Sequence, residues 1–171
     1  MPLLAVTVLG DDRPGIVAET TGLLAAVGGN LEDSTMTLLR GAFAMVLLVQ
    51  TDRPADEVRS ALAPLEADAR LSVDVRAVSA HEQGERGTAY LLSVHGGDRP
   101  GIVSAVTAEL ARAGGNVTDL STRLSGQLYV LLAEVDLPER ADVEALAADL
   151  RRVARDLGVD VTLRPLDMDL L

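Results

Sequence analysis

The chain has 171 residues and a formal net charge of −11, and every positively charged side chain in it is arginine. Hydrophobic residues make up 48%, which is enough for a core, while cysteine is absent, so disulfides and thiolate metal sites are excluded. Such an acidic protein is repelled by nucleic-acid phosphates, so direct DNA binding is disfavoured.

Targeting signals are also missing from the sequence pattern. The chain contains no apolar run of about 18 residues, the length that a membrane-spanning helix needs. The first residues lack the positive charge that opens a signal peptide. We therefore expect a cytoplasmic protein without a membrane segment. The densest basic cluster, Arg151, Arg152 and Arg155, lies among aspartates and is interpreted as a solvated helix face.

Two halves of the chain repeat each other at a displacement of 86 positions. The hexapeptide Asp-Arg-Pro-Gly-Ile-Val occupies residues 12–17 and returns at 98–103, and Phe43 aligns with Tyr129 without a gap. Between residues 12 and 35, 13 of 24 positions are identical to their counterparts. The chain is therefore a duplication, and each copy should be a domain with its own core.

The same elements are predicted in chain order in both copies. A short apolar strand is followed by a polar turn, a helix that opens at proline and ends at Gly-Gly, a β-hairpin, a second helix and a last strand. In the first copy these are residues 3–9, 11–13, 14–29, 31–50, 55–69 and 71–78. In the second copy they are residues 89–94, 97–99, 100–115, 117–135, 141–157 and 159–163. Pro64 predicts a kink or an early end in the first copy's second helix.

The element order is βαββαβ, twice, which is the ferredoxin-like arrangement of the α+β class. It predicts antiparallel four-stranded sheets with both helices on one face. We expect one domain at residues 1–78, a linker at 79–88 and a second domain at 89–166.

The hexapeptide, lying after a strand and followed by Gly-Gly-Asn at 28–30 and 114–116, resembles the ACT domain. This family of small βαββαβ modules binds amino acids and regulates metabolic enzymes. Two such domains without a catalytic domain most resemble the group of glycine cleavage system transcriptional repressors. The same pattern also opens ACT domains fused to formyltetrahydrofolate deformylases and to some phosphoserine phosphatases, so it identifies the domain better than the pathway.

The resemblance implies where a ligand binds. In ACT domains, which commonly sit side by side, the site lies where the first strand–helix loop of one domain meets the second strand of its neighbour. One site would then use Asp12, Arg13, Gly15 and Ile16 with Asn116 and Asp119, and the other Asp98, Arg99, Gly101 and Ile102 with Asn30 and Asp33.

The residue types suit a free amino acid. The start of a helix presents unpaired N–H groups to a carboxylate, and an arginine such as Arg13 or Arg99 can grip it in a bidentate pair. Gly15 and Gly101 allow a ligand close to the backbone. The four aspartates of the two sites, Asp12, Asp33, Asp98 and Asp119, are candidate partners for the ammonium group.

Each of these residues also has a purely structural interpretation. Asp12 and Asp98 could cap the helices that follow them. Both Gly-Gly pairs are expected to be helix stops. Asn30 and Asn116 could adopt the left-handed conformation in the same turn. The two loop arginines could simply be solvated.

Catalysis is not expected. The imidazole bases are His81, in the linker, and His95, which ends a strand beside the second loop and could touch a ligand in one site. Ser93 and Ser104 lie near His95 in sequence without an evident third group. No spacing predicts a metal site, and no cofactor is expected. The loop at 10–15 lacks the lysine and hydroxyl residue of a phosphate-binding P-loop.

The sequence thus predicts a non-enzymatic sensor of an amino acid, with glycine or a relative as the specific expectation. It would modulate a transcription factor or a metabolic enzyme, and exposed sheet edges make a homodimer plausible. Two alternatives remain open: a ligand-free docking and dimerisation module, and a non-catalytic subunit of a separately encoded enzyme.

Overall fold

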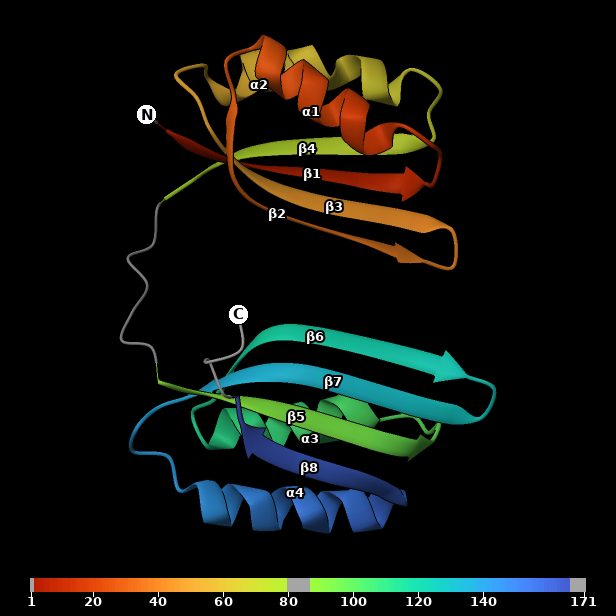
Figure 1. The fold of residues 1–171 in the computed structure, drawn as a ribbon, viewed down its shortest axis with the longest axis vertical. Coiled ribbons are helices and arrows are strands. Elements are labelled where there is room, and N and C mark those ends of the chain that lie inside the picture. Colours follow the sequence, from red (N-terminus) through yellow and green to blue (C-terminus); the bar gives the residue numbers. More distant parts are fainter. Residues whose placement is uncertain (1, 80–86, 167–171) are drawn as a thin grey trace. The chain divides into compact units, whose positions relative to one another are not determined.

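The computed structural model describes residues 2–79 and 87–166, which form two compact units (Figure 1). The first unit contains β1 (Leu3–Asp11), α1 (Ile16–Ala26), β2 (Asn30–Leu39), β3 (Ala42–Gln50), α2 (Ala55–Leu62), the 3₁₀ turn η1 (Ala63–Glu66) and β4 (Leu71–Val78). The second contains β5 (Thr88–Gly97), α3 (Ile102–Arg112), β6 (Asn116–Ser125), β7 (Leu128–Leu137), α4 (Val143–Leu157) and β8 (Val159–Pro165). His81 lies outside the described residues.

Each unit is a four-stranded antiparallel sheet, in the order β2-β3-β1-β4 in the first and β6-β7-β5-β8 in the second. Both helices of a unit cover the same face of its sheet (Figure 1). The predicted α+β class and the βαββαβ order are therefore confirmed. The side-by-side placement of the two units stays a prediction.

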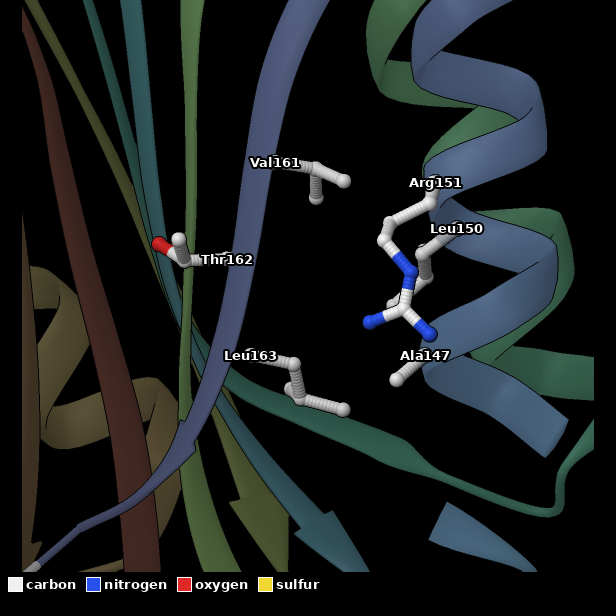
Figure 2. A pocket seen from close by; sticks show the side chains of 6 residues that line it. All are labelled: Ala147, Leu150, Arg151, Val161, Thr162 and Leu163. Carbon is white, nitrogen blue, oxygen red and sulfur yellow. The ribbon is translucent and has the colours of Figure 1, made fainter. Parts of the chain in front are cut away.

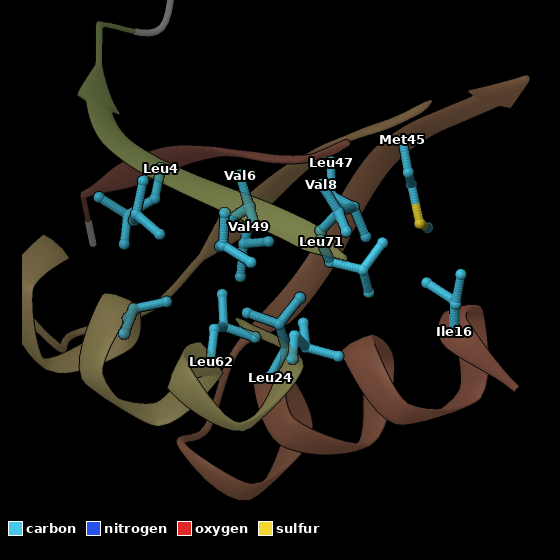
Figure 3. Packing of buried hydrophobic residues seen from close by; sticks show 14 of the residues in the cluster. Leu4, Val6, Val8, Ile16, Leu24, Met45, Leu47, Val49, Leu62 and Leu71 are labelled. Atoms are coloured by element: carbon cyan, nitrogen blue, oxygen red, sulfur yellow. The ribbon is translucent and has the colours of Figure 1, made fainter. Parts of the chain in front are cut away.

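Alternation along the strands builds the core of the first unit. Leu4, Val6 and Val8 in β1 are at most 1% exposed, because every second side chain of a strand points to the same face. These side chains pack toward Leu24 of α1 and Leu62 of α2, both fully buried (Figure 3). Aliphatic side chains thus provide nearly all of this core, as the scarcity of aromatics requires.

The second unit repeats this plan with its own residues. Leu92 and Val94 of β5 and Leu110 of α3 are fully buried, and Leu150 of α4 is 1% exposed. No buried cluster includes residues of both units, within the described chain. Each copy therefore has its own core, as the duplication requires.

The first helix of each copy begins later than expected. The expected starts were Pro14 and Pro100, but α1 and α3 begin two residues further on, because Gly15 and Gly101 have φ near +91° and +93°. This left-handed conformation is outside the helix and is disfavoured for residues with a Cβ. The proline and glycine therefore form a turn ahead of the helix.

At the ends of these helices, the prediction for the glycines is confirmed and the one for the asparagines is not. Gly28 and Gly114 have φ of 73° and 76° and stop the helices, which confirms the Gly-Gly pairs as helix stops. The left-handed interpretation of Asn30 and Asn116 is wrong. Both asparagines have negative φ and open β2 and β6, since the preceding glycines already complete the turn.

The second helices of the two copies differ in length. α2 ends at Leu62 and continues as the 3₁₀ turn that contains Pro64, which confirms the predicted early end. α4 runs unbroken over 15 residues. It begins at Val143 rather than at residue 141, because the side chain of Asp142 caps it by accepting a hydrogen bond from the N–H of Ala145 at 2.9 Å.

A β-bulge occurs at the same place in both hairpins. The register between β2 and β3 shifts between Leu31 and Asp33, and that between β6 and β7 shifts between Val117 and Asp119. A bulge places two residues opposite one and so resets which side chains face which side. Beyond the first bulge, Met36 pairs with the buried Met45, which puts it on the side of the sheet that carries the helices.

Candidate functional site

The loop between β1 and α1 borders an open hollow of about 450 Å³ in the first unit. Its lining residues come from the hexapeptide, the first turn of α1 and the strands β2 and β3. They are Asp12, Arg13, Gly15, Ile16, Val17, Ala18, Met36 and Phe43. All four predicted loop residues of this copy are thus brought together around one hollow.

The equivalent loop of the second unit borders a hollow of about 290 Å³. Its lining residues are Asp98, Arg99, Gly101, Ile102, Val103, Ser104 and Tyr129. The four predicted loop residues of this copy again lie together. The hollow recurs at the same place in both copies, with the hexapeptide residues kept and the other lining residues changed.

The strand residues proposed from the resemblance do not line the hollow of their own unit. Asn30, Asp33, Asn116 and Asp119 all lie on β2 or β6. The Oδ1 atom of Asp33 accepts a hydrogen bond from the N–H of Ser34 at 2.8 Å. Their contribution to a site of the neighbouring copy stays a prediction.

The loop glycines leave the hollow open to the backbone. A Cβ built on Gly15 would meet no atom within 4 Å, and one on Gly101 would meet Ser104 Oγ at 3.8 Å. The space in front of the helix start is therefore free. Glycine is required here by its φ, and the same residue leaves the following N–H groups accessible.

Capping by the loop aspartates is not seen. The residue that precedes each helix is the glycine, and neither helix start receives a hydrogen bond from a side chain. Asp12 and Asp98 are exposed at the rim of their hollows. The capping interpretation is wrong because the Pro-Gly turn puts each aspartate too far upstream of its helix.

Arg13 is engaged within its own unit. Its Nη2 atom donates to Oε2 of Glu19 at 2.6 Å, and the two side chains are 34% and 36% exposed. This hydrogen bond raises the pKa of Arg13, and the negative charges of Glu19 and Asp68 act in the same direction. The simply solvated interpretation of Arg13 is therefore wrong: a carboxylate of α1 holds its guanidinium.

Arg99 has different surroundings. Ala105 occupies the position that Glu19 has in the first copy, and within residues 2–79 and 87–166 Arg99 forms no ion pair. A Cβ on Gly158 would lie 3.5 Å from Nη2 of Arg99, so the guanidinium lies beside the C-terminal cap of α4. The negative end of a helix dipole favours a cation at this place.

The rims of the two hollows differ in polarity. Phe43, 2% exposed, is replaced by the half-buried Tyr129, and Ala18 is replaced by Ser104. The Ser104 hydroxyl donates to the carbonyl of Gly101 at 3.0 Å. Met36 lines only the first of these two hollows. The second hollow therefore carries two hydroxyl groups where the first has an aromatic ring and a methyl group.

Sequence reasoning missed the residues that line the hollows beyond the hexapeptide. The gapless alignment of Phe43 with Tyr129 was a usable signal, because it placed an aromatic ring at the same point of both copies. Nothing comparable marks Met36, which faces the hollow only because the bulge sets its direction.

His95 lies away from the second hollow. Its Nε2 atom is 3.6 Å from Oδ2 of Asp160, and both side chains are more than half exposed. Ser93 shares a hydrogen bond of 2.5 Å with Thr162 on the neighbouring strand. The described part of the chain holds no group of three or more His, Cys, Asp or Glu that could bind a metal.

A further hollow of about 150 Å³ lies between α4 and β8. Figure 2 shows Arg151 extending from α4 toward β8, beside Leu150 and Leu163, while the side chain of Thr162 points to the other side of the strand. Four aliphatic side chains line the space together with Arg151 and Thr162. We interpret it as a packing seam at the sheet edge, covered by the stem of Arg151.

The second unit also buries a charge between its helices. Glu109 is 5% exposed and pairs with Arg112 on α3, while Arg152 on α4 lies 3.8 Å away and also pairs with Asp149. Leu23 holds the equivalent position in the first copy. The pairs tie α3 to α4 and account for part of the predicted basic helix face.

Comparison with known proteins agrees with this architecture. The model of the ACT domain matches twice, at residues 3–78 and 88–164. The chain belongs to the ACT-domain family. It consists of two copies of this domain in tandem, and no helix in the described ranges is long and apolar enough to cross a membrane.

Relatives of two kinds are found among curated proteins. A UPF0237 protein of Methanopyrus kandleri is 44% identical over 78 residues, which cover 44% of this chain and 84% of that protein. The glycine cleavage system transcriptional repressor of Escherichia coli is 27% identical over 121 residues, which cover 70% of this chain and 64% of the repressor.

Among solved structures, a protein from Galdieria sulphuraria whose function is unknown superimposes with a TM-score of 0.82. It is 32% identical, and the match covers 96% of this chain and 98% of that one. The arrangement of both units of this chain is therefore similar to that of another protein along nearly all of the two matched chains.

Proposed function

We propose that the chain is a regulatory protein that senses a free amino acid at the β1–α1 and β5–α3 loops. The observation that supports this most strongly is the recurrence of one hollow, with an aspartate, an arginine and an open glycine, in two copies whose helices have otherwise diverged. The backbone conformation explains why the glycine is kept, but it does not require the aspartate and the arginine beside it, and loops positioned by a rigid scaffold commonly carry function.

The ligand contacts follow from the chemistry of the rim. The carboxylate of the amino acid is bound by the N–H groups beyond Gly15 or Gly101 and by the loop arginine, Arg13 or Arg99. Asp12 or Asp98 accepts hydrogen bonds from the ammonium group. Ile16 and Ile102, each 2% exposed, form the apolar floor. Hollows of 290–450 Å³ lie at the small end of ligand sites, which suits a single amino acid.

Glycine or a closely related amino acid is the ligand we propose, and a transcription factor or metabolic enzyme is the partner. The support for this is the sequence relationship to the Escherichia coli glycine cleavage repressor. Because the chain carries a net charge of −11, its effect on transcription would pass through a protein partner rather than through DNA. The ligand can change the activity of the partner only to the extent that its affinity differs between two states of this protein.

Thermal unfolding in the presence of each standard amino acid tests the proposal. A ligand at about 100 times its dissociation constant adds about 2.7 kcal/mol of stability, which for a chain of this size is a shift of about 5–10 °C. The shift should shrink in Asp12→Ala or Asp98→Ala. Asp52→Ala, an exposed aspartate that lines neither hollow, is the matched control.

A panel in which no amino acid shifts the transition at millimolar concentration would reject the sensor. The docking and dimerisation module, or the non-catalytic subunit, would then be the better explanation. Affinity capture of the partner would be the next experiment.

A further inference from the structure

The two hollows differ most in whether the guanidinium of their arginine is already paired with a carboxylate. Resting on the proposed function, we infer that the two sites are unequal, and that Arg99 in the second unit is the residue that binds the ligand's carboxylate. In the first unit's hollow the Arg13–Glu19 pair competes with a ligand carboxylate, so this is the weaker of the two sites. Three differences between equivalent residues of the two copies support this.

The first difference is the clamp on Arg13. Its guanidinium already donates to a carboxylate oxygen at 2.6 Å, so a ligand would have to displace Glu19 and would gain only an equivalent bond. Glu19 would then remain beside the hollow as an unpaired anion. Its negative charge would repel the carboxylate of a ligand bound to Arg13.

The second difference is the absence of that clamp around Arg99. Ala105 replaces the glutamate, and the guanidinium lies beside Gly158 at the end of α4. The helix end attracts the cation without neutralising it. Arg99 is exposed and lines the hollow, so its N–H groups are available to a carboxylate.

The third difference is the polarity of the rim. Tyr129 and Ser104 bring hydroxyl groups to the second hollow, where Phe43 and Ala18 leave the first one apolar. Hydroxyl groups can satisfy the polar atoms of an amino acid, and an apolar rim leaves them unpaired at a cost. A small amino acid with a free carboxylate therefore fits the second hollow better than the first.

Isothermal titration of the full chain with glycine, serine and the other standard amino acids tests the inference. For the amino acid that binds, we expect one tight site per chain. Arg99→Gln should weaken binding by about tenfold or more, the usual effect of losing a hydrogen bond to a charged group. Arg13→Gln should weaken it several-fold less. Arg164→Gln, outside both hollows, should bind as the wild type does.

Introducing the glutamate of the first copy at the equivalent position of the second copy gives a sharper test. Ala105→Glu installs in the second unit the clamp that Glu19 forms in the first, and should weaken binding by about tenfold or more. Ala105→Gln has the same shape without the charge and should keep most of the affinity. Thermal unfolding without ligand shows whether each variant is folded.

The outcomes separate the two levels of the proposal. Binding that is weakened as much by Arg13→Gln as by Arg99→Gln, or that survives Ala105→Glu unchanged, overturns the inequality of the sites and leaves amino-acid sensing intact. A wild-type chain that binds none of the amino acids overturns the sensing proposal and the inference with it.

Discussion

The two units are the same fold built twice, and they differ mainly in their helices. The sheets share strand order, register and even the position of the β-bulge. The helices differ in their buried polar residues: the first unit buries Thr20 where the second has Val106, and the second buries Glu109 where the first has Leu23. Backbone geometry has thus been kept more strictly than side-chain packing.

The reason is physical. A left-handed glycine or a bulge allows few substitutes, because another residue there strains the backbone. A helix face tolerates many combinations of similar total volume. The same contrast explains why the loop hollows persist while their polarity has changed. Matched substitutions at equivalent positions can test how independent and how different the two units are.

Removing a leucine from each core should have the largest effect. Leu24→Ala and Leu110→Ala occupy equivalent, fully buried positions, and each should lower the stability of its own unit by about 2–5 kcal/mol through lost burial and a cavity. Amide hydrogen exchange, followed peptide by peptide, measures each unit separately. Equal acceleration in both units from a single substitution would show that the cores are coupled.

Replacing the loop glycines should cost less. Gly15→Ala and Gly101→Ala force a Cβ into φ near +90°, which should cost about 1–2 kcal/mol in either unit although the Cβ meets open space. Gly15→Asn is the control, since asparagine tolerates this conformation better. Urea unfolding measures the change. If alanine and asparagine are equally harmless, the conformation is not strained.

Exchanging the buried threonine should stabilise the first unit. The Oγ1 atom of Thr20 is fully buried and has no hydrogen-bond partner within the described structure. Thr20→Val copies Val106 and should raise stability by about 1 kcal/mol, because it removes an unsatisfied hydroxyl. The reverse change, Val106→Thr, should lower it. A gain from Val106→Thr in urea unfolding would contradict this reasoning.

The smallest expected effect is at Gly22. This exposed helical glycine corresponds to Ala108, and a Cβ there would meet no atom within 4 Å. Gly22→Ala should raise stability by about 0.5–1 kcal/mol, since alanine is the better helix former. Thermal unfolding measures the gain. A loss would indicate that the exposed face of α1 is less open than it looks.

Much of this fold could be predicted from the sequence because both copies carry the same signals. The Gly-Gly stops, the hairpins and the break at Pro64 follow from local backbone chemistry. The helix starts could not be placed correctly, because proline is acceptable both at the first helical position and in a turn before it. Only the conformation of Gly15 and Gly101 decides between these two.

The site was predictable in part. The loop residues of both copies were identified from the repeated hexapeptide, and they do lie together around a hollow. The pairing of Arg13 with Glu19 could not be predicted. The two residues are six positions apart, and their contact depends on the Pro-Gly turn that lies before the helix. The lining by Met36 and Phe43 required the sheet register, which the sequence shows only indirectly.

The paired bulges have a consequence for how these hairpins can change in length. Residues inserted at the turn after Leu39 would lengthen the loop and leave the ladder unchanged. Deleting Glu32, the extra residue of the first bulge, would remove the bulge and its local bend but leave every later residue of β2 opposite its present partner in β3. Deleting a residue of the regular ladder, such as Thr35, would instead turn the side chains on one side of the deletion to the opposite face. Changes in length should therefore be tolerated at the hairpin tips and at the bulges, and be harmful elsewhere in these ladders.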